Sequence, residues 1–207
     1  MPLASIVGWS GVAVGTATTL AQLVRVRQRG TDGVNATTWS LFTLMSAFWL
    51  SYGLAASSLE VIVANVVGAP FLIALLARLD GDARRRGLAQ GLAAVTVTTW
   101  LPMALFGWNA GLVGVGVLIV ATRLPQLVRL LRASHARGVS TASWALGSLN
   151  VALWLAYYAS SSMPAAAASM IFALVANVSI VLLAVARHRG RPIGSIVPRR
   201  HPALAFA

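Results

Sequence analysis

The sequence contains no cysteine and no lysine, and only 4 of its 207 residues are acidic. The missing cysteine excludes disulfides, thiolate nucleophiles and cysteine metal sites. The 3 histidines stand in basic segments without other ligands, so we expect no metal and no cofactor. The sequence also has no paired carboxylates, no nucleophile with a base and no phosphate-binding glycine loop. It therefore does not predict an enzyme.

Charged residues are scarce as well, at 10%, whereas 58% of the residues are hydrophobic and the mean hydropathy is +0.79. No long hydrophilic stretch remains for a separate catalytic domain. The net charge of +12 does not indicate nucleic-acid binding, because the arginines lie between apolar segments and form no basic face with interleaved aromatics. This composition is typical of a protein embedded in the lipid bilayer.

Apolar runs separated by polar breaks predict an all-α membrane protein with seven transmembrane helices, each of about 20 residues. Residues 188–207 are basic and rich in proline, and we expect a disordered cytoplasmic tail there. The seven expected spans are Leu3–Val24, Ala36–Ala55, Leu59–Ala77, Leu88–Phe106, Gly111–Leu131, Thr141–Ser160 and Ala165–Ala186.

The arginines predict the orientation, because arginine in short loops stays on the cytoplasmic side. They follow the first, third, fifth and seventh spans, and the other three connections carry none. We therefore expect the N-terminus outside and the C-terminus in the cytoplasm. The exclusive use of arginine, with abundant alanine, indicates a bacterial protein, which places it in the plasma (inner) membrane.

The chain contains an internal repeat. Thr18 to Arg25 match Thr122 to Arg129 at an offset of 104 residues, and Gly33 to Tyr52 match Gly138 to Tyr157 at 105. The second stretch pairs Trp39 with Trp144 and Trp49 with Trp154, which chance does not readily produce when only 7 residues are tryptophan.

Each repeat holds three expected spans, and one further span between them keeps the two copies parallel. Two parallel repeats with a site at their interface are a known transporter plan. The expected organisation is two three-helix repeats joined by a linker helix: residues 3–79, a linker at 84–107, residues 108–187 and the tail.

Two groups of residues carry a resemblance to a known family. Leu124-Pro125-Gln126-Leu127, followed by a basic loop and Gly138-Val139-Ser140-Thr141, looks like a PQ-loop repeat. The first copy reads Leu20-Ala21-Gln22-Leu23 and Gly33-Val34-Asn35-Ala36, with alanine in place of the motif proline. With seven spans in two such units, the chain resembles the SWEET and SemiSWEET sugar-transporter branch of the PQ-loop superfamily.

The resemblance implies two triple-helix bundles around a central path, lined by a tryptophan of the second helix and an asparagine of the third. Trp49 and Trp154 match the tryptophan positions, and Asn65 and Asn177 match the asparagine positions. The spacing in the first repeat supports this assignment, whereas Trp154 and Asn177 are further apart in the sequence than Trp49 and Asn65. At 1.5 Å per residue, Trp49 lies about 20 Å above the inner end of its span and Asn65 about 9 Å below the outer end, so their depths coincide in a core of about 30 Å.

The alternative is structural: tryptophans in aromatic belts and asparagines that join helices. We assign Gln22, Gln126, Tyr52 and Tyr157 to gates, and Pro125 to a hinge, because proline removes a helical hydrogen bond. A static kink at Pro125 is the alternative. Arg123 is expected to extend to the cytoplasmic surface, which is favoured over a role in substrate binding.

We expect a sugar facilitator that moves a small neutral solute, a mono- or disaccharide, by alternating access. No acid or histidine lies deep in a span, which favours passive transport over proton coupling. A PQ-loop carrier of amino acids or other metabolites, and a non-transporting receptor or assembly protein on the same fold, remain alternatives. We expect the lipid bilayer as the surroundings and no nucleic acid as a partner. The sequence does not decide whether the chain forms a homo-oligomer.

Overall fold

The computed structural model describes residues 3–31, 34–132 and 140–189. Within these ranges the chain is helical and forms seven helical segments. The fourth segment is composite, because α4 (Gly81–Val95), the π-helical turn η1 (Thr96–Trp100) and α5 (Leu101–Phe106) follow one another without a break. The others are α1 (Leu3–Arg29), α2 (Ala36–Ala55), α3 (Leu59–Leu76), α6 (Trp108–Arg132), α7 (Thr141–Ser160) and α8 (Pro164–His188). The expected tail lies outside the described residues, apart from its first two positions.

The second helix of each repeat begins at the same kind of cap. The side chain of Asn35 accepts a hydrogen bond from the backbone N–H of Thr38, and Ser140 does the same for Ser143. Such caps satisfy backbone donors that have no partner in the first helical turn. The Asn and Ser that follow the Gly-Val pair of the repeat motif therefore start helices α2 and α7.

The linker begins earlier than the expected Leu88, because Asp80 caps it. The Asp80 carboxylate accepts hydrogen bonds of 3.0 Å from the backbone N–H groups of Ala83 and Asp82. These bonds favour the charged carboxylate and hold the pKa of Asp80 below its usual value. The first turns of α4 thus form a charged extension outside the apolar part of the helix.

Among the described residues, five segments are long and apolar enough to cross a membrane: Leu3–Gln28, Leu59–Leu76, Gly81–Phe106, Trp108–Arg132 and Pro164–His188. The chain is thus an all-helical protein with several segments suited to the bilayer. The expected spans α2 and α7 are not among these five segments. Their mean hydropathy is lower because they carry more hydroxyl, amide and aromatic side chains. Several of these hydroxyls bond back to their own helix, as Thr43 does to the Trp39 carbonyl and Ser148 to that of Trp144.

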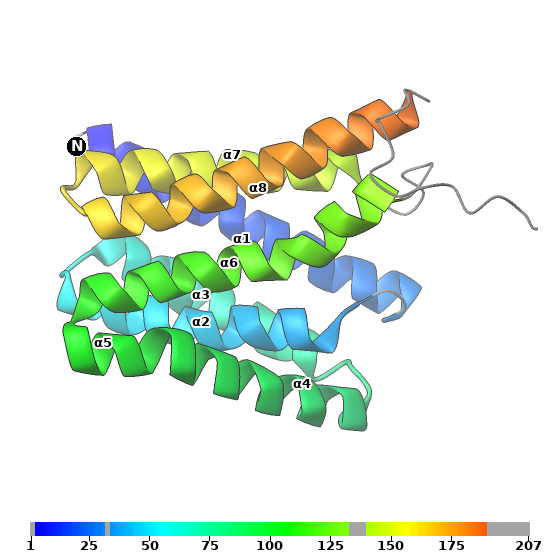
Figure 1. The fold of residues 1–207 in the computed structure, drawn as a ribbon, viewed down its shortest axis with the longest axis horizontal. Coiled ribbons are helices and arrows are strands. Elements are labelled where there is room, and N and C mark those ends of the chain that lie inside the picture. Colours follow the sequence, from blue (N-terminus) through cyan, green and yellow to red (C-terminus); the bar gives the residue numbers. More distant parts are fainter. Residues whose placement is uncertain (1–2, 32–33, 133–139, 190–207) are drawn as a thin grey trace, which may run out of the picture.

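The two repeats pack alike. In the first, α3 packs against both α1 and α2, and in the second α8 packs against both α6 and α7. The linker helix α4 lies along α2, and α1 packs on α7 across the two repeats. Figure 1 shows that α1 and α6 begin at the same end of the molecule, so the repeats run in the same direction.

The hydrophobic core is shared at one end of the molecule and divided at the other. One cluster extends from the end where α1 begins through the middle of the molecule, as far as Leu41 of α2, and joins residues of both repeats and the linker, among them Phe48, Val95 and Val115. Near the arginine-bearing end, the first repeat has its own cluster around Leu23, Val26 and Leu75. The second repeat has another, around Leu130, Ile180 and Ala184. Figure 1 shows α6 and α8 running away from α1 and α2 toward this end.

Candidate functional site

The two tryptophans of the repeat meet at the boundary between the repeats. The ring of Tyr158 stacks with Trp49 at a centroid distance of 5.5 Å and an angle of 8°, and with Trp154 at 5.6 Å and 27°. Trp49 belongs to α2, and both other rings belong to α7. Stacked rings at this separation attract beyond the effect of the area they bury. The structure therefore brings Trp49 and Trp154 together, with Tyr158 as the ring they share.

Tyr158 is not among the site residues predicted from the sequence. Its position in the first repeat is Gly53, so the comparison of the repeats offered no partner for it. The only signal was a pair of adjacent tyrosines in a chain with 3 in total. Tyr158 is nonetheless 3% exposed and stands in the shared core.

The two expected gate tyrosines hold matching positions beside this stack. Tyr52 meets Trp49 edge to face at 5.9 Å, and Tyr157 meets Trp154 at 5.6 Å. The two tyrosines differ in their other contacts. Tyr52 packs its ring against Trp108 at 5.6 Å, whereas Tyr157 makes polar contacts.

Tyr157 joins the two repeats through hydrogen bonds. Its hydroxyl donates to Oε2 of Glu60 at 3.0 Å and lies 2.7 Å from Oγ of Ser58. The second carboxylate oxygen of Glu60 accepts from the Ser5 hydroxyl. We call Ser5, Ser58, Glu60 and Tyr157 the outer latch, because they lie at the end of the helices that the sequence predicts to be outside. It ties α7 of the second repeat to α1 and α3 of the first.

Glycines let α1 approach α7 beside the latch. A Cβ atom at Gly8 would lie 2.7 Å from the Tyr157 ring, and one at Gly11 would lie 3.1 Å from Trp154. The repeat offset of 104 places Leu112 and Val115 at the matching positions of α6, where both are buried in the shared core. The contact between α1 and α7 is thus close, and its counterpart in the other repeat is filled by larger side chains.

The two asparagines bond inside their own repeats. Asn65 Oδ1 accepts from the Ser46 hydroxyl of α2 at 3.0 Å, and its Nδ2 donates to the Val61 carbonyl at 2.8 Å. Asn177 is 2% exposed and accepts from Nε of Arg123 at 2.5 Å. In this conformation both amides therefore have protein partners, which a bound solute would have to share or replace.

The prediction that Arg123 extends to the cytoplasmic surface is wrong. Its side chain turns inward along α6, where Nη1 donates to the Ile119 carbonyl at 2.8 Å and to the Thr122 hydroxyl at 3.0 Å. The amide of Asn177 supplies the third acceptor. Three neutral acceptors on α6 and α8 thus hold the Arg123 guanidinium inside the second repeat.

The remaining gate and hinge residues lie toward the divided end of the core. Pro125 is inside α6, which continues through it and changes direction in its second half (Figure 1). A missing backbone donor and ring crowding are the usual causes of such a bend. Nε2 of Gln126 is buried and has no hydrogen-bond partner among the described residues. Gln22 is partly exposed on α1.

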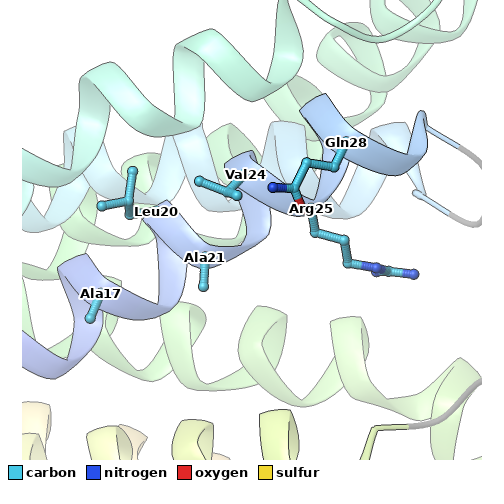
Figure 2. Close-up of a pocket in the computed structure, with 6 residues that line it drawn as sticks. All are labelled: Ala17, Leu20, Ala21, Val24, Arg25 and Gln28. Carbon is cyan, nitrogen blue, oxygen red and sulfur yellow. The ribbon is translucent and has the colours of Figure 1, made fainter.

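A surface groove lies elsewhere, on α1. It holds about 560 Å³ and runs along the exposed face of α1 that Figure 2 shows, lined by Ala17, Leu20, Ala21, Val24, Arg25 and Gln28. A second groove of about 470 Å³ continues along the same face. By helical periodicity this face is opposite Gly8, Gly11 and Gly15. Neither groove contains a predicted site residue, and exposed apolar side chains are what a lipid-facing surface requires.

These features define a class before any relative is considered: an all-helical protein with several helices suited to crossing a membrane, built from two similar halves with aromatic rings stacked between them. Comparisons with protein-family models, with curated proteins and with solved structures find no match to this chain.

Proposed function

We propose that the chain is a seven-span membrane transporter that works by alternating access between its two repeats, and that it facilitates the movement of a sugar-sized solute. One observation carries this proposal: the repeats share a core at one end and have separate cores at the other. Two halves that share a core around paired aromatic residues and have separate cores beyond it fit a carrier that opens to one side at a time.

In this proposal the described conformation is open toward the arginine-bearing end. The outer latch and the close contact of α1 with α7 shut the opposite end, and the stack of Trp49, Tyr158 and Trp154 lies beneath them. The other state requires α1 to part from α7 and the latch to break. The solute then passes the level of the stack.

The arginines support the orientation. Arg27 near the end of α1, Arg84 at the start of α4, Arg132 at the end of α6 and Arg187 near the end of α8 lie at one end of the molecule, because of the directions in which these helices run. Arginine is enriched on the cytoplasmic side of membrane proteins. The open end in the described conformation is therefore the cytoplasmic one.

The test is uptake by the purified full-length chain in liposomes. Radiolabelled monosaccharides, disaccharides and neutral amino acids are supplied outside, and protein-free liposomes give the background. Saturable sugar uptake supports a sugar facilitator, whereas amino-acid uptake alone supports the other PQ-loop carriers. If the folded protein transports no solute of the panel, a receptor or assembly protein on the same fold replaces the carrier proposal.

A further inference from the structure

A guanidinium lies where the shared core ends. On α6, Arg123 follows Ile119 of the shared core and precedes Leu127, which packs on the separate core of the second repeat. On α8, its partner Asn177 likewise stands between Ala173 and Ile180 of the same two clusters. From Arg123 to the end of α6 at Arg132 the helix rises about 14 Å. Arg123 thus lies at the level where the shared core gives way to the separate core of the second repeat.

Some N–H donors of the Arg123 guanidinium make no hydrogen bond to the described residues. Its hydrogen bonds to Asn177, Ile119 and Thr122 use Nε and Nη1 only. Arginine has five N–H donors, and two of them are on Nη2. Within the described part of the chain, Nη2 makes no hydrogen bond, and it is not among the buried polar atoms that lack a partner. These two donors can therefore bind a further acceptor.

The charge of Arg123 has no carboxylate beside it among the described residues. Glu60 is held by Ser5 and Tyr157, Asp80 caps α4, and Asp82 pairs with Arg85. All three acceptors of Arg123 are neutral. A cation inside a helix bundle at this depth is costly unless an opposite charge accompanies it, and such residues commonly mark solute pathways.

The repeat itself does not need this arginine. At the offset of 104, the first repeat has Thr19, whose hydroxyl bonds to the Gly15 carbonyl of its own helix. Asn65 takes its hydrogen bond from a serine, whereas Asn177 takes it from Arg123. One three-helix unit therefore folds with neutral groups where the other carries a cation.

We propose that Arg123 binds the carboxylate of the transported solute, with Asn177 holding the guanidinium in place. Nη2 donates charge-assisted hydrogen bonds to a carboxylate oxygen, and the solute supplies the missing negative charge. This inference rests on the proposed transport function and changes its substrate class: the solute bears a carboxylate, as a sugar acid or an amino acid does, and is not a neutral sugar.

Matched solutes test the proposal. Glucuronate and glucose share a ring and differ in a carboxylate, and alanine and alaninamide differ in the same group. Uptake of each by the full-length chain in liposomes is measured together with the thermal stabilisation that each gives the purified protein in detergent. We expect the carboxylate member of at least one pair to act at a concentration about tenfold or more below its neutral partner.

Variants locate the effect. Arg123→Gln keeps a donor for Asn177 but removes the charge, so the preference for the carboxylate should fall about tenfold or more, whereas Arg123→Lys should retain much of it. Arg25→Gln makes the same change on the exposed face of α1 and should leave the preference unchanged. The thermal stability of each variant without solute shows whether it is folded.

The outcomes separate this inference from the transport proposal. Uptake of glucose without any response to glucuronate or alanine would overturn the carboxylate site and keep the transporter. Stabilisation by a carboxylate solute without uptake would keep the site and overturn transport. No response to any of the four solutes would overturn the carboxylate site, and absence of uptake across the wider panel as well would overturn transport. A preference that survives in a folded Arg123→Gln protein would remove Arg123 from the site.

Discussion

If the chain is the proposed carrier, removing the Tyr157 hydroxyl should weaken the closure that the latch provides. Tyr157→Phe deletes the 3.0 Å hydrogen bond to Glu60 and the 2.7 Å contact with Ser58, while the ring can still pack on Trp154. A neutral hydrogen bond contributes about 0.5–1.5 kcal/mol and one to a charged group about 1.5–3 kcal/mol. Because Glu60 keeps its bond to Ser5 and water reaches it when the latch opens, we expect a net loss of about 1–3 kcal/mol. That loss shifts the equilibrium about 5- to 150-fold toward the outward-open state.

The absence of cysteine makes this shift measurable. Asn150 lies at the contact of α1 with α7, where its Oδ1 is 3.3 Å from the place of a Cβ at Gly15. A single cysteine introduced there by Asn150→Cys can be labelled in whole cells with a membrane-impermeant maleimide. We expect the labelling rate from outside to rise when Tyr157→Phe is added, in proportion to the outward-open population.

Tyr52→Phe is the matched control. Tyr52 occupies the same position in the first repeat, but its ring packs on Trp49 and Trp108 and it is not part of the latch. This change should leave the labelling rate close to that of the parent. An unchanged rate in Tyr157→Phe, or an equal rise in both variants, would refute the assignment of the latch.

Three further predictions concern packing, orientation and energy coupling. Gly114→Ala should destabilise the protein by about 1–3 kcal/mol, because a Cβ there would lie 1.5 Å from the Thr98 carbonyl oxygen of the linker. The melting temperature in detergent should fall accordingly. An unchanged melting temperature would contradict this contact between α6 and the linker. Tags at the N-terminus and near Ser161 should be reachable from outside the cell, and a tag within 187–207 should not; an accessible tail would contradict the span count. Transport should not respond to an imposed pH gradient, since the spans carry no deep carboxylate or histidine; uphill accumulation driven by that gradient would contradict passive transport.

Helix positions could be predicted closely because they depend on local signals. The bounds of α2 and α7 agree with the expected Ala36–Ala55 and Thr141–Ser160, since a polar cap precedes each apolar run. Hydropathy missed the start of the linker at Gly81, because its first turns are charged and only the Asp80 cap marks them. Hydropathy does not establish α2 and α7 as spans, since these helices carry more hydroxyl, amide and aromatic side chains than the other segments.

The candidate site was predictable only where the two repeats agree. The duplication pointed to Trp49 and Trp154, and the structure places both on one ring. It could not point to Tyr158, because the matching residue is Gly53. Depth along a helix placed Asn65 and Asn177 but not their partners, since depth does not say toward which neighbour a side chain turns. For the same reason the inward turn of Arg123 could not be predicted.

The central claim is that the repeats move a solute past the residues at their boundary. The most direct measurement is solute uptake per folded molecule in liposomes for Trp49→Ala and Trp154→Ala, with Asn65→Ala and Asn177→Ala beside them. The control pair is Trp39→Ala and Trp144→Ala, which are duplicated too but pack on the separate cores of their own repeats. We predict a sharp loss of uptake in the first four variants while their folded fraction persists, and near-normal uptake per folded molecule in the control pair. Parental uptake per folded molecule in the first four, with lower thermal stability alone, would contradict the account.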